Sequence, residues 1–144
     1  MCDMKNFTDC LAKWNHWVKI MYTQCVQVGA NICMPIYYEE LVLRPDRVVK
    51  RLFKFLNIPF NNAVLHHENY VGDKVLLSKY EASTNQVKQA INFDGLNTWL
   101  GKIPAHVLDK VDGIAPMLTF FGYETKSKNK TNYHKLNGDN FQQN

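Results

Sequence analysis

The stretch from Leu77 to Val87 brings together side chains that could bind an anion. It reads Leu-Ser-Lys-Tyr-Glu-Ala-Ser-Thr-Asn-Gln-Val and is dense in hydroxyl and amide groups. Hydroxyl and backbone N–H donors of this kind can surround an anionic ligand. The alternative is a solvated surface loop, which the residue types alone favour.

His66, His67 and Glu68 form the other cluster that invites a chemical reading, as metal ligands. Adjacent residues on a helix point in different directions, so the two histidines are poor co-ligands. The spacing suggests no third ligand, and we expect a capping or packing role with no metal. The sequence also lacks the glycine-rich phosphate loops Gly-x-x-x-x-Gly-Lys-Ser/Thr and Gly-x-Gly-x-x-Gly, so the motifs indicate no ordinary nucleotide-binding enzyme.

The four cysteines are Cys2, Cys10, Cys25 and Cys33, and none has the close spacing of a zinc knuckle. Cys25 and Cys33 flank Gly29, where a helix that turns back into a strand could bring the two thiols together. The alternative is a pair of buried thiols that act as small apolar groups. The residues alone leave both possibilities open.

Several predicted elements would position these groups. Apolar residues at steps of three and four predict an amphipathic helix over residues 8–28, which starts at Thr8 and Asp9 and stops at Gly29. The strand-forming run at residues 32–38 predicts a short strand, at an edge or a bulge because of Pro35. Pro45 begins a second helix that stops before Pro59.

The second half of the chain is less regular. Asn61 and Asn62 cap a short segment through His67, and residues 72–97 are expected to be mostly irregular. Such long loops are usually functional. Pro104 begins a last helix, kinked near Gly113, that ends at Gly122. We expect one domain over residues 1–123 and a disordered basic tail over residues 124–144.

The composition is that of an ordinary soluble globular domain, with 46% hydrophobic and 21% charged residues and a net charge of +4. The mild positive charge suits an acidic ligand or peptide, and we expect no nucleic-acid partner. No apolar run could span a bilayer, and the first residues form no signal peptide, so the chain is either cytoplasmic or separated from an upstream anchor. Sequons at Asn6 and Asn129 leave glycosylation open.

Several short sequence segments, taken together in their order and spacing, bear on the alternatives left open above. They are Asp9–Asn15 (Asp-Cys-Leu-Ala-Lys-Trp-Asn), Met21–Cys25, Val28-Gly29, Cys33-Met34, Tyr38–Pro45 (Tyr-Glu-Glu-Leu-Val-Leu-Arg-Pro), Lys54–Pro59, Val64–Glu68 (Val-Leu-His-His-Glu), Leu77–Lys79, Ser83–Val87, Trp99–Pro104 (Trp-Leu-Gly-Lys-Ile-Pro) and Ile114–Leu118. Over residues 9–123 the sequence resembles the tyrosylprotein sulfotransferase family, in its C-terminal part. The double-histidine and Trp-x-Gly-Lys-Ile-Pro strings are the most specific, and they argue against a carbohydrate sulfotransferase.

The resemblance implies an α/β fold: the C-terminal portion of a P-loop-like sulfotransferase domain with a parallel sheet, mostly helical in this piece. It implies transfer of the sulfuryl group of 3′-phosphoadenosine 5′-phosphosulfate (PAPS) to tyrosine hydroxyls in acidic peptide segments, without a metal. The family works in the Golgi lumen on a membrane anchor, usually as a homodimer. Here the anchor would lie outside the chain.

By the same resemblance, Tyr38 contacts the nucleotide, and residues 83–92 line the cofactor. That lining set is Ser83, Thr84, Asn85, Gln86, Val87, Lys88, Gln89, Ala90, Ile91 and Asn92. Ser83 would have a catalytic role, because it also supports the transferring sulfuryl group. Cys25 and Cys33 match a disulfide pair of the family, which fits an oxidising lumen.

Some family features are absent from the matching residues. Thr98 stands where the family has a cofactor-contacting lysine, Ala82 replaces a basic residue, and the loop at residues 72–76 is shorter. The family's catalytic glutamate and phosphosulfate loop would lie before Met1. We therefore expect this piece alone to be inactive. The alternative is a non-catalytic protein that pairs with or modulates a full-length sulfotransferase.

Overall fold

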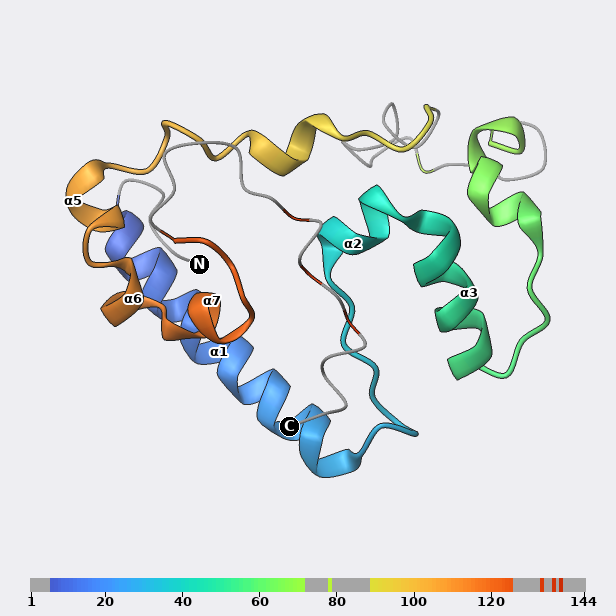
Figure 1. Ribbon diagram of the computed structural model, residues 1–144, viewed down its shortest axis with the longest axis horizontal. Helices are drawn as coiled ribbons and strands as arrows, with labels where there is room; N and C mark the ends of the chain where they lie inside the picture. Colours follow the sequence, from blue (N-terminus) through green and yellow to red (C-terminus); the bar gives the residue numbers. More distant parts are fainter. Residues whose placement is uncertain are drawn as a thin grey trace. The chain divides into compact units, whose positions relative to one another are not determined.

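The computed structural model describes residues 6–71, 78, 89–125, 133, 136 and 138 (Figure 1). Over these residues the regular elements are all helical. In chain order they are α1 (Phe7–Val28), α2 (Tyr38–Leu43), α3 (Pro45–Phe55), η1 (Asn62–Asn69), η2 (Asp94–Asn97), α5 (Ala105–Leu108), α6 (Val111–Ile114) and α7 (Pro116–Phe120). The mostly helical character is therefore confirmed for the described residues, whereas the parallel sheet stays a prediction.

The chain divides into two compact units. The first unit contains residues 1–40 and 96–144, and the second contains residues 41–95. The division into one domain over residues 1–123 and a disordered tail stays a prediction. Three residues of that expected tail, Tyr133, Leu136 and Gly138, are nevertheless described, and all three are buried.

Helix α1 confirms the predicted amphipathic helix, and it begins at Phe7, one residue before the predicted start at Thr8. The side chain of Asn6 caps it: Asn6 Oδ1 accepts a hydrogen bond from the Asp9 N–H at 3.0 Å. Gly29, at φ 86°, ends it, since glycine adopts this backbone conformation without a steric penalty. Although α1 has 22 residues, no helix in the described part is long and apolar enough to cross a membrane.

The predicted strand over residues 32–38 is wrong. Residues 33–37 have no regular structure, and Tyr38 is already the first residue of α2. The N–H groups of Ile32 and Cys33 both donate to the Gly29 carbonyl at 3.0 Å, which makes a turn. Pro35 has no N–H to offer a neighbouring strand. The apolar run is therefore a half-buried connection, held by side chains.

Three short helices replace the single kinked helix that we expected after Pro104. Helices α5, α6 and α7 are separated near Lys110 and Ala115, and Pro116 begins α7. Val107, Val111, Ala115 and Met117 are buried along this path. Helices α6 and α7 pack against α1, as Figure 1 shows. A hydrogen bond of 2.8 Å from the Met117 N–H to Asn15 Oδ1 supports this packing.

In the second unit, α3 begins at Pro45, as predicted, and buries Val48. It ends at Phe55, before Pro59, with Asn57 in a left-handed conformation at φ 54°. Asn61 caps the next segment, because its Oδ1 accepts from the Ala63 N–H at 2.9 Å. That segment, η1, is a 3-10 helix that continues to Asn69, two residues beyond the expected end.

Candidate functional site

Tyr38 is the first site residue that the sequence predicted and the structure describes. It begins α2 and is 58% exposed. Its chain neighbours Tyr37 and Glu39 are only partly exposed, and Glu40 is buried. The chain thus turns Tyr38 towards solvent while the residues around it are held by packing.

Two phenols fix the residues on either side of Tyr38. The Tyr37 hydroxyl donates to the Phe121 carbonyl oxygen, and the Tyr123 hydroxyl donates to Glu39 Oε2, both at 2.9 Å. Burial, and next the negative charge of Glu39, raise the pKa of Tyr37 to about 12. The same two causes, with the hydrogen bond to Glu39, raise the pKa of Tyr123 further above its ordinary value. Both phenols therefore stay protonated near neutral pH and act as donors, not as bases.

Glu40 is the buried carboxylate of this region, with 1% exposure. Its Oε2 accepts a hydrogen bond from the Gly138 N–H at 2.9 Å. Sequence reasoning missed Tyr37, Tyr123 and the buried side of the Tyr-Glu-Glu-Leu string. The paired residues lie 84 and 98 positions apart, so no local pattern could have found them.

Residues 83–88 of the predicted cofactor-lining loop, from Ser83 to Lys88, lie outside the described residues. Gln89, Ala90 and Asn92 are described and exposed, and Ile91 is partly buried. Asn92 Oδ1 accepts from the Asp94 N–H at 2.7 Å and so leads the chain into η2. These four residues belong to the second unit and Tyr38 to the first. That Tyr38 and Ser83 contact the same cofactor stays a prediction.

Trp99, next to Thr98, has a defined hydrogen bond in the first unit. Its Nε1 donates to the Tyr133 hydroxyl at 2.9 Å, and this hydroxyl donates in turn to the Leu96 carbonyl oxygen at 2.8 Å. Tyr133 is 7% exposed. Thr98 itself is exposed and carries no charge. The hydrogen bonds of Trp99 and Leu96 therefore hold the chain on both sides of Thr98.

A cavity of about 410 Å³ lies in the first unit. Its lining residues are Trp14, Val18, Met21, Tyr22, Cys25, Cys33, Pro35, Ile36, Tyr37, Phe121 and Tyr123. They are apolar or aromatic, and none is cationic. Tyr38 is not among them. A multiply charged nucleotide needs cationic or N–H donors, so this cavity does not suit PAPS.

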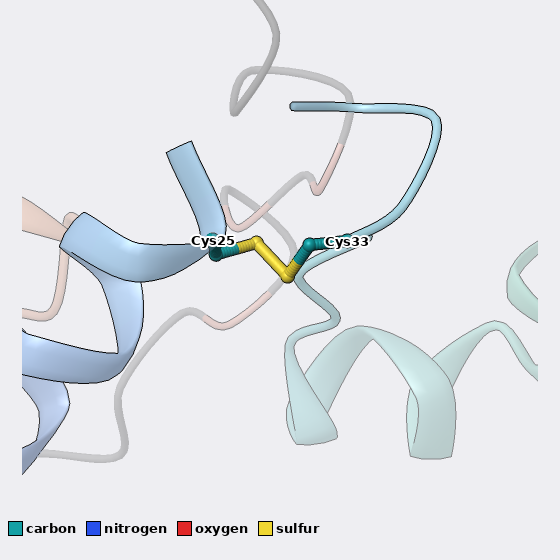
Figure 2. The surroundings of a disulfide bond; sticks show 2 residues. All are labelled: Cys25 and Cys33. Atoms are coloured by element: carbon teal, nitrogen blue, oxygen red, sulfur yellow. A yellow bond between two sulfur atoms is a disulfide. The ribbon is translucent and has the colours of Figure 1, made fainter. Parts of the chain in front are cut away.

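The disulfide between Cys25 and Cys33 is confirmed. It joins the last turn of α1 to the start of the irregular segment, as Figure 2 shows, with the two Cα atoms 5.3 Å apart. This distance lies within the range that a disulfide needs. Cys10 is disulfide-bonded as well. Disulfides persist in oxidising compartments and are rare in the cytosol.

The histidine pair lies in η1. Glu68 is near both rings, with His66 Nδ1 at 3.8 Å and His67 Nδ1 at 3.7 Å from its carboxylate oxygens. The backbone of η1 is not helical at His66, whose φ angle is −131°. Residues 6–71, 78 and 89–125 contain no group of three or more ligand-type side chains that could hold a metal ion.

Comparison with known proteins points to one family. Residues 2–62 match the model of the sulfotransferase family. The chain is 47% identical over 133 residues to protein-tyrosine sulfotransferase 1 of Danio rerio, a match that covers 91% of this chain and 37% of the relative. It is 44% identical to protein-tyrosine sulfotransferase 2 of Gallus gallus, over 91% of this chain and 36% of the relative.

The protein-tyrosine sulfotransferase of Drosophila melanogaster is 41% identical over 124 residues, which is 85% of this chain and 25% of the relative. The chain therefore spans between a quarter and about a third of the length of these relatives.

Proposed function

Because this chain belongs to the protein-tyrosine sulfotransferase family, we propose that it forms the C-terminal part of an enzyme that transfers sulfuryl from PAPS to tyrosine hydroxyls in acidic peptide segments. The observation that supports this is an identity of 41–47% to relatives from three animals, over most of the chain. In this proposal the chain contributes one part of the cofactor site. The rest of the enzyme supplies the other groups.

The residues that we assign to the cofactor fit a polyanion by their chemistry. The sequence from Ser83 to Asn92 offers hydroxyl, amide and ammonium donors. PAPS supplies the activated sulfuryl group, and its transfer places negative charge on the oxygens around the sulfur. Donors that already point at those oxygens stabilise this charge without reorganising. We assign that role to the Ser83 hydroxyl.

Tyr38 would contribute its exposed phenol ring to the nucleotide. A side chain that binds a ligand gains from being oriented before the ligand arrives. Tyr37 and Glu39 supply that orientation, because their hydrogen bonds to Phe121 and Tyr123 fix the chain immediately before and after Tyr38. The first unit thus holds the backbone at Tyr38 in place for one contact with the cofactor.

The acceptor tyrosine needs a base near its phenol. Tyr37 and Tyr123 cannot serve, since their raised pKa values keep them protonated. We propose that the base comes from the part of the enzyme that the chain does not match. We further propose that the whole enzyme forms homodimers in the Golgi and that its membrane anchor lies in that same unmatched part. The disulfides at Cys25–Cys33 and Cys10 are compatible with the oxidising Golgi lumen.

A chimaera tests this function directly. The part of the Danio rerio relative that matches this chain is replaced by the chain itself, and sulfuryl transfer from radiolabelled PAPS to an acidic tyrosine peptide is measured. We expect the chimaera to be active, and Ser83→Ala to lower its kcat by about 10²–10³-fold, the usual cost of one transition-state donor. Ser78→Ala, which removes a hydroxyl from the same polar stretch of the sequence but outside the cofactor set, is the matched control.

Failure takes two distinguishable forms. A chimaera that binds 3′-phosphoadenosine 5′-phosphate and melts cooperatively but transfers no sulfuryl group contradicts the proposed reaction. Equal activity of the Ser83→Ala and Ser78→Ala chimaeras contradicts only the role of Ser83. The isolated chain should label no peptide.

One observation favours the alternative function as a non-catalytic partner. None of the residues of α1 is buried, and Trp17 and Met21 are 60% and 57% exposed. An apolar helix face of this kind marks an interaction surface. If the chain acts as a partner, it co-purifies with an intact sulfotransferase, and Trp17→Glu weakens this pairing.

A further inference from the structure

We propose that Asn6 carries an N-linked glycan. Asn6, Phe7 and Thr8 form the sequon Asn-x-Thr, the acceptor sequence for this modification. Both Asn6 and Thr8 are exposed. A glycan is bulky and needs a surface position, and the start of α1 provides one.

The capping geometry of α1 leaves the reactive atom available. Asn6 is the N-cap residue, and its Oδ1 accepts the Asp9 N–H at 3.0 Å. An asparagine amide has two separate functions, a carbonyl acceptor and an NH₂ group. The cap uses the carbonyl oxygen, whereas the sugar is attached to Nδ2. The helix cap and the glycan are therefore compatible on the same side chain.

The disulfides indicate an oxidising compartment, whether or not the chain has the proposed enzyme activity. Cys25 pairs with Cys33, and Cys10 is disulfide-bonded too. Chains with such bonds fold in the oxidising secretory pathway. Oligosaccharides are transferred to asparagine in that same pathway, so Asn6 meets the transferase there.

The modification is a simple substitution without redox chemistry. The donor is a lipid-linked oligosaccharide diphosphate. A bond forms between Asn6 Nδ2 and C1 of the first sugar, while the bond between C1 and the diphosphate oxygen breaks. The lipid diphosphate leaves with the bonding electron pair, and the amide releases one proton.

Asn31 is a useful contrast within the same unit. The sequence Asn31-Ile32-Cys33 has a thiol where a sequon has a hydroxyl, and the sulfur of Cys33 is bonded to Cys25. Asn31 is exposed but lacks an acceptor sequence. Exposure alone therefore does not select Asn6; its sequon does.

The test translates the full chain behind a cleavable signal peptide in the presence of endoplasmic-reticulum microsomes. Peptide N-glycosidase in heavy-oxygen water then converts each glycosylated asparagine to a labelled aspartate, which mass spectrometry locates. We expect label at Asn6, and we expect its complete loss in Thr8→Ala and in Asn6→Asp. Both variants keep a side-chain acceptor for the α1 cap, so a loss of label does not reflect a loss of the helix.

Two further variants fix the meaning of the result. Asn129→Gln removes the other sequon and should leave the label at Asn6 unchanged. Cys33→Ser completes a sequon that begins at Asn31 and should gain a glycan there, which proves that the transferase reaches this region. A bare Asn6 in a translocated chain that accepts a glycan at Asn31 in Cys33→Ser overturns the proposal. The readout is independent of sulfuryl transfer, so the two proposals fail separately.

Discussion

The two units hold their polar side chains in different ways. In the first unit, a hydrogen bond joins Tyr123 to Glu39 across 84 positions of the chain. In the second unit, the ion pair on α3 joins Lys50 to Asp46 across four positions, and both side chains are more than half exposed. The first kind of contact forms only when distant segments meet, whereas the second forms within one helix.

This difference indicates where stability depends on the tertiary fold. A partly buried hydroxyl that loses its partner cannot turn fully to water, so removing the partner is costly. An exposed pair on a helix loses little, because water and salt already screen it. We therefore expect substitutions at these two places to differ several-fold in their effect on the free energy of unfolding.

The largest effect should come from Glu39→Ala. This change leaves the Tyr123 hydroxyl without its acceptor and should lower the free energy of unfolding by about 1–3 kcal/mol. Urea denaturation followed by circular dichroism measures it. Tyr123→Phe and the double variant complete a cycle that isolates the pair. Additive effects of the two single substitutions would show that the contact contributes nothing.

An intermediate effect should appear at alkaline pH in the first unit. The phenol of Tyr37 has an ordinary pKa near 10, which the fold raises to about 12. Between these values the unfolded chain loses the proton and the folded chain keeps it, so the free energy of unfolding falls as pH rises. This contribution is complete below pH 10 and is lost as pH passes through about 12.

Tyr37→Phe checks that assignment, since phenylalanine does not titrate. Denaturation of the wild type and the variant at several pH values between about 9 and 11 should give a shallower fall for the variant. Parallel curves would mean that Tyr37 titrates alike in both states. The difference between the two proteins removes the contribution of the lysines, which titrate in the same range.

The smallest effect should come from Lys50→Ala on α3. It breaks the pair with Asp46 and the contact of the Lys50 ammonium with the Phe60 ring, whose centroid is 5.4 Å away. We expect a loss of about 0.5 kcal/mol or less in the free energy of unfolding, and less still in high salt. A loss as large as that of Glu39→Ala would end the contrast between the units.

The same contrast explains which features the sequence could predict. Helices α1 and α3 follow from apolar spacing, Gly29 and Pro45, and the Asn61 cap follows from its residue type, because all of these are local signals. The strand predicted over residues 32–38 failed for the opposite reason. Residue types that suit a strand also suit a half-buried connection. The hydrogen bond from the Tyr37 hydroxyl to the distant Phe121 carbonyl oxygen favours the connection, and no local sequence pattern reveals it.

The candidate site divides along the same line. The disulfide of Cys25 and Cys33 was found through family resemblance, since spacing alone left it open. Tyr38 was assigned to the cofactor in the same way, and this assignment stays a prediction. The hydrogen bond between Tyr123 and Glu39, the neighbour of Tyr38, could not be predicted, because 84 positions of the chain separate the two bonded residues. Ser83 and its neighbours up to Lys88 lie outside the described residues, so their contact with the cofactor stays a prediction.

The short reach of the Cys25–Cys33 bond has a consequence for the order of assembly. It closes a ring across only eight positions, and the entropic cost of closing such a small ring is low. The bond can therefore form while residues 96–125 are still being synthesised. Once the bond has formed, the segment from Cys33 to Tyr37 is tethered to the end of α1. Phe121 and Tyr123 then form their hydrogen bonds with a segment that is already linked to the helix.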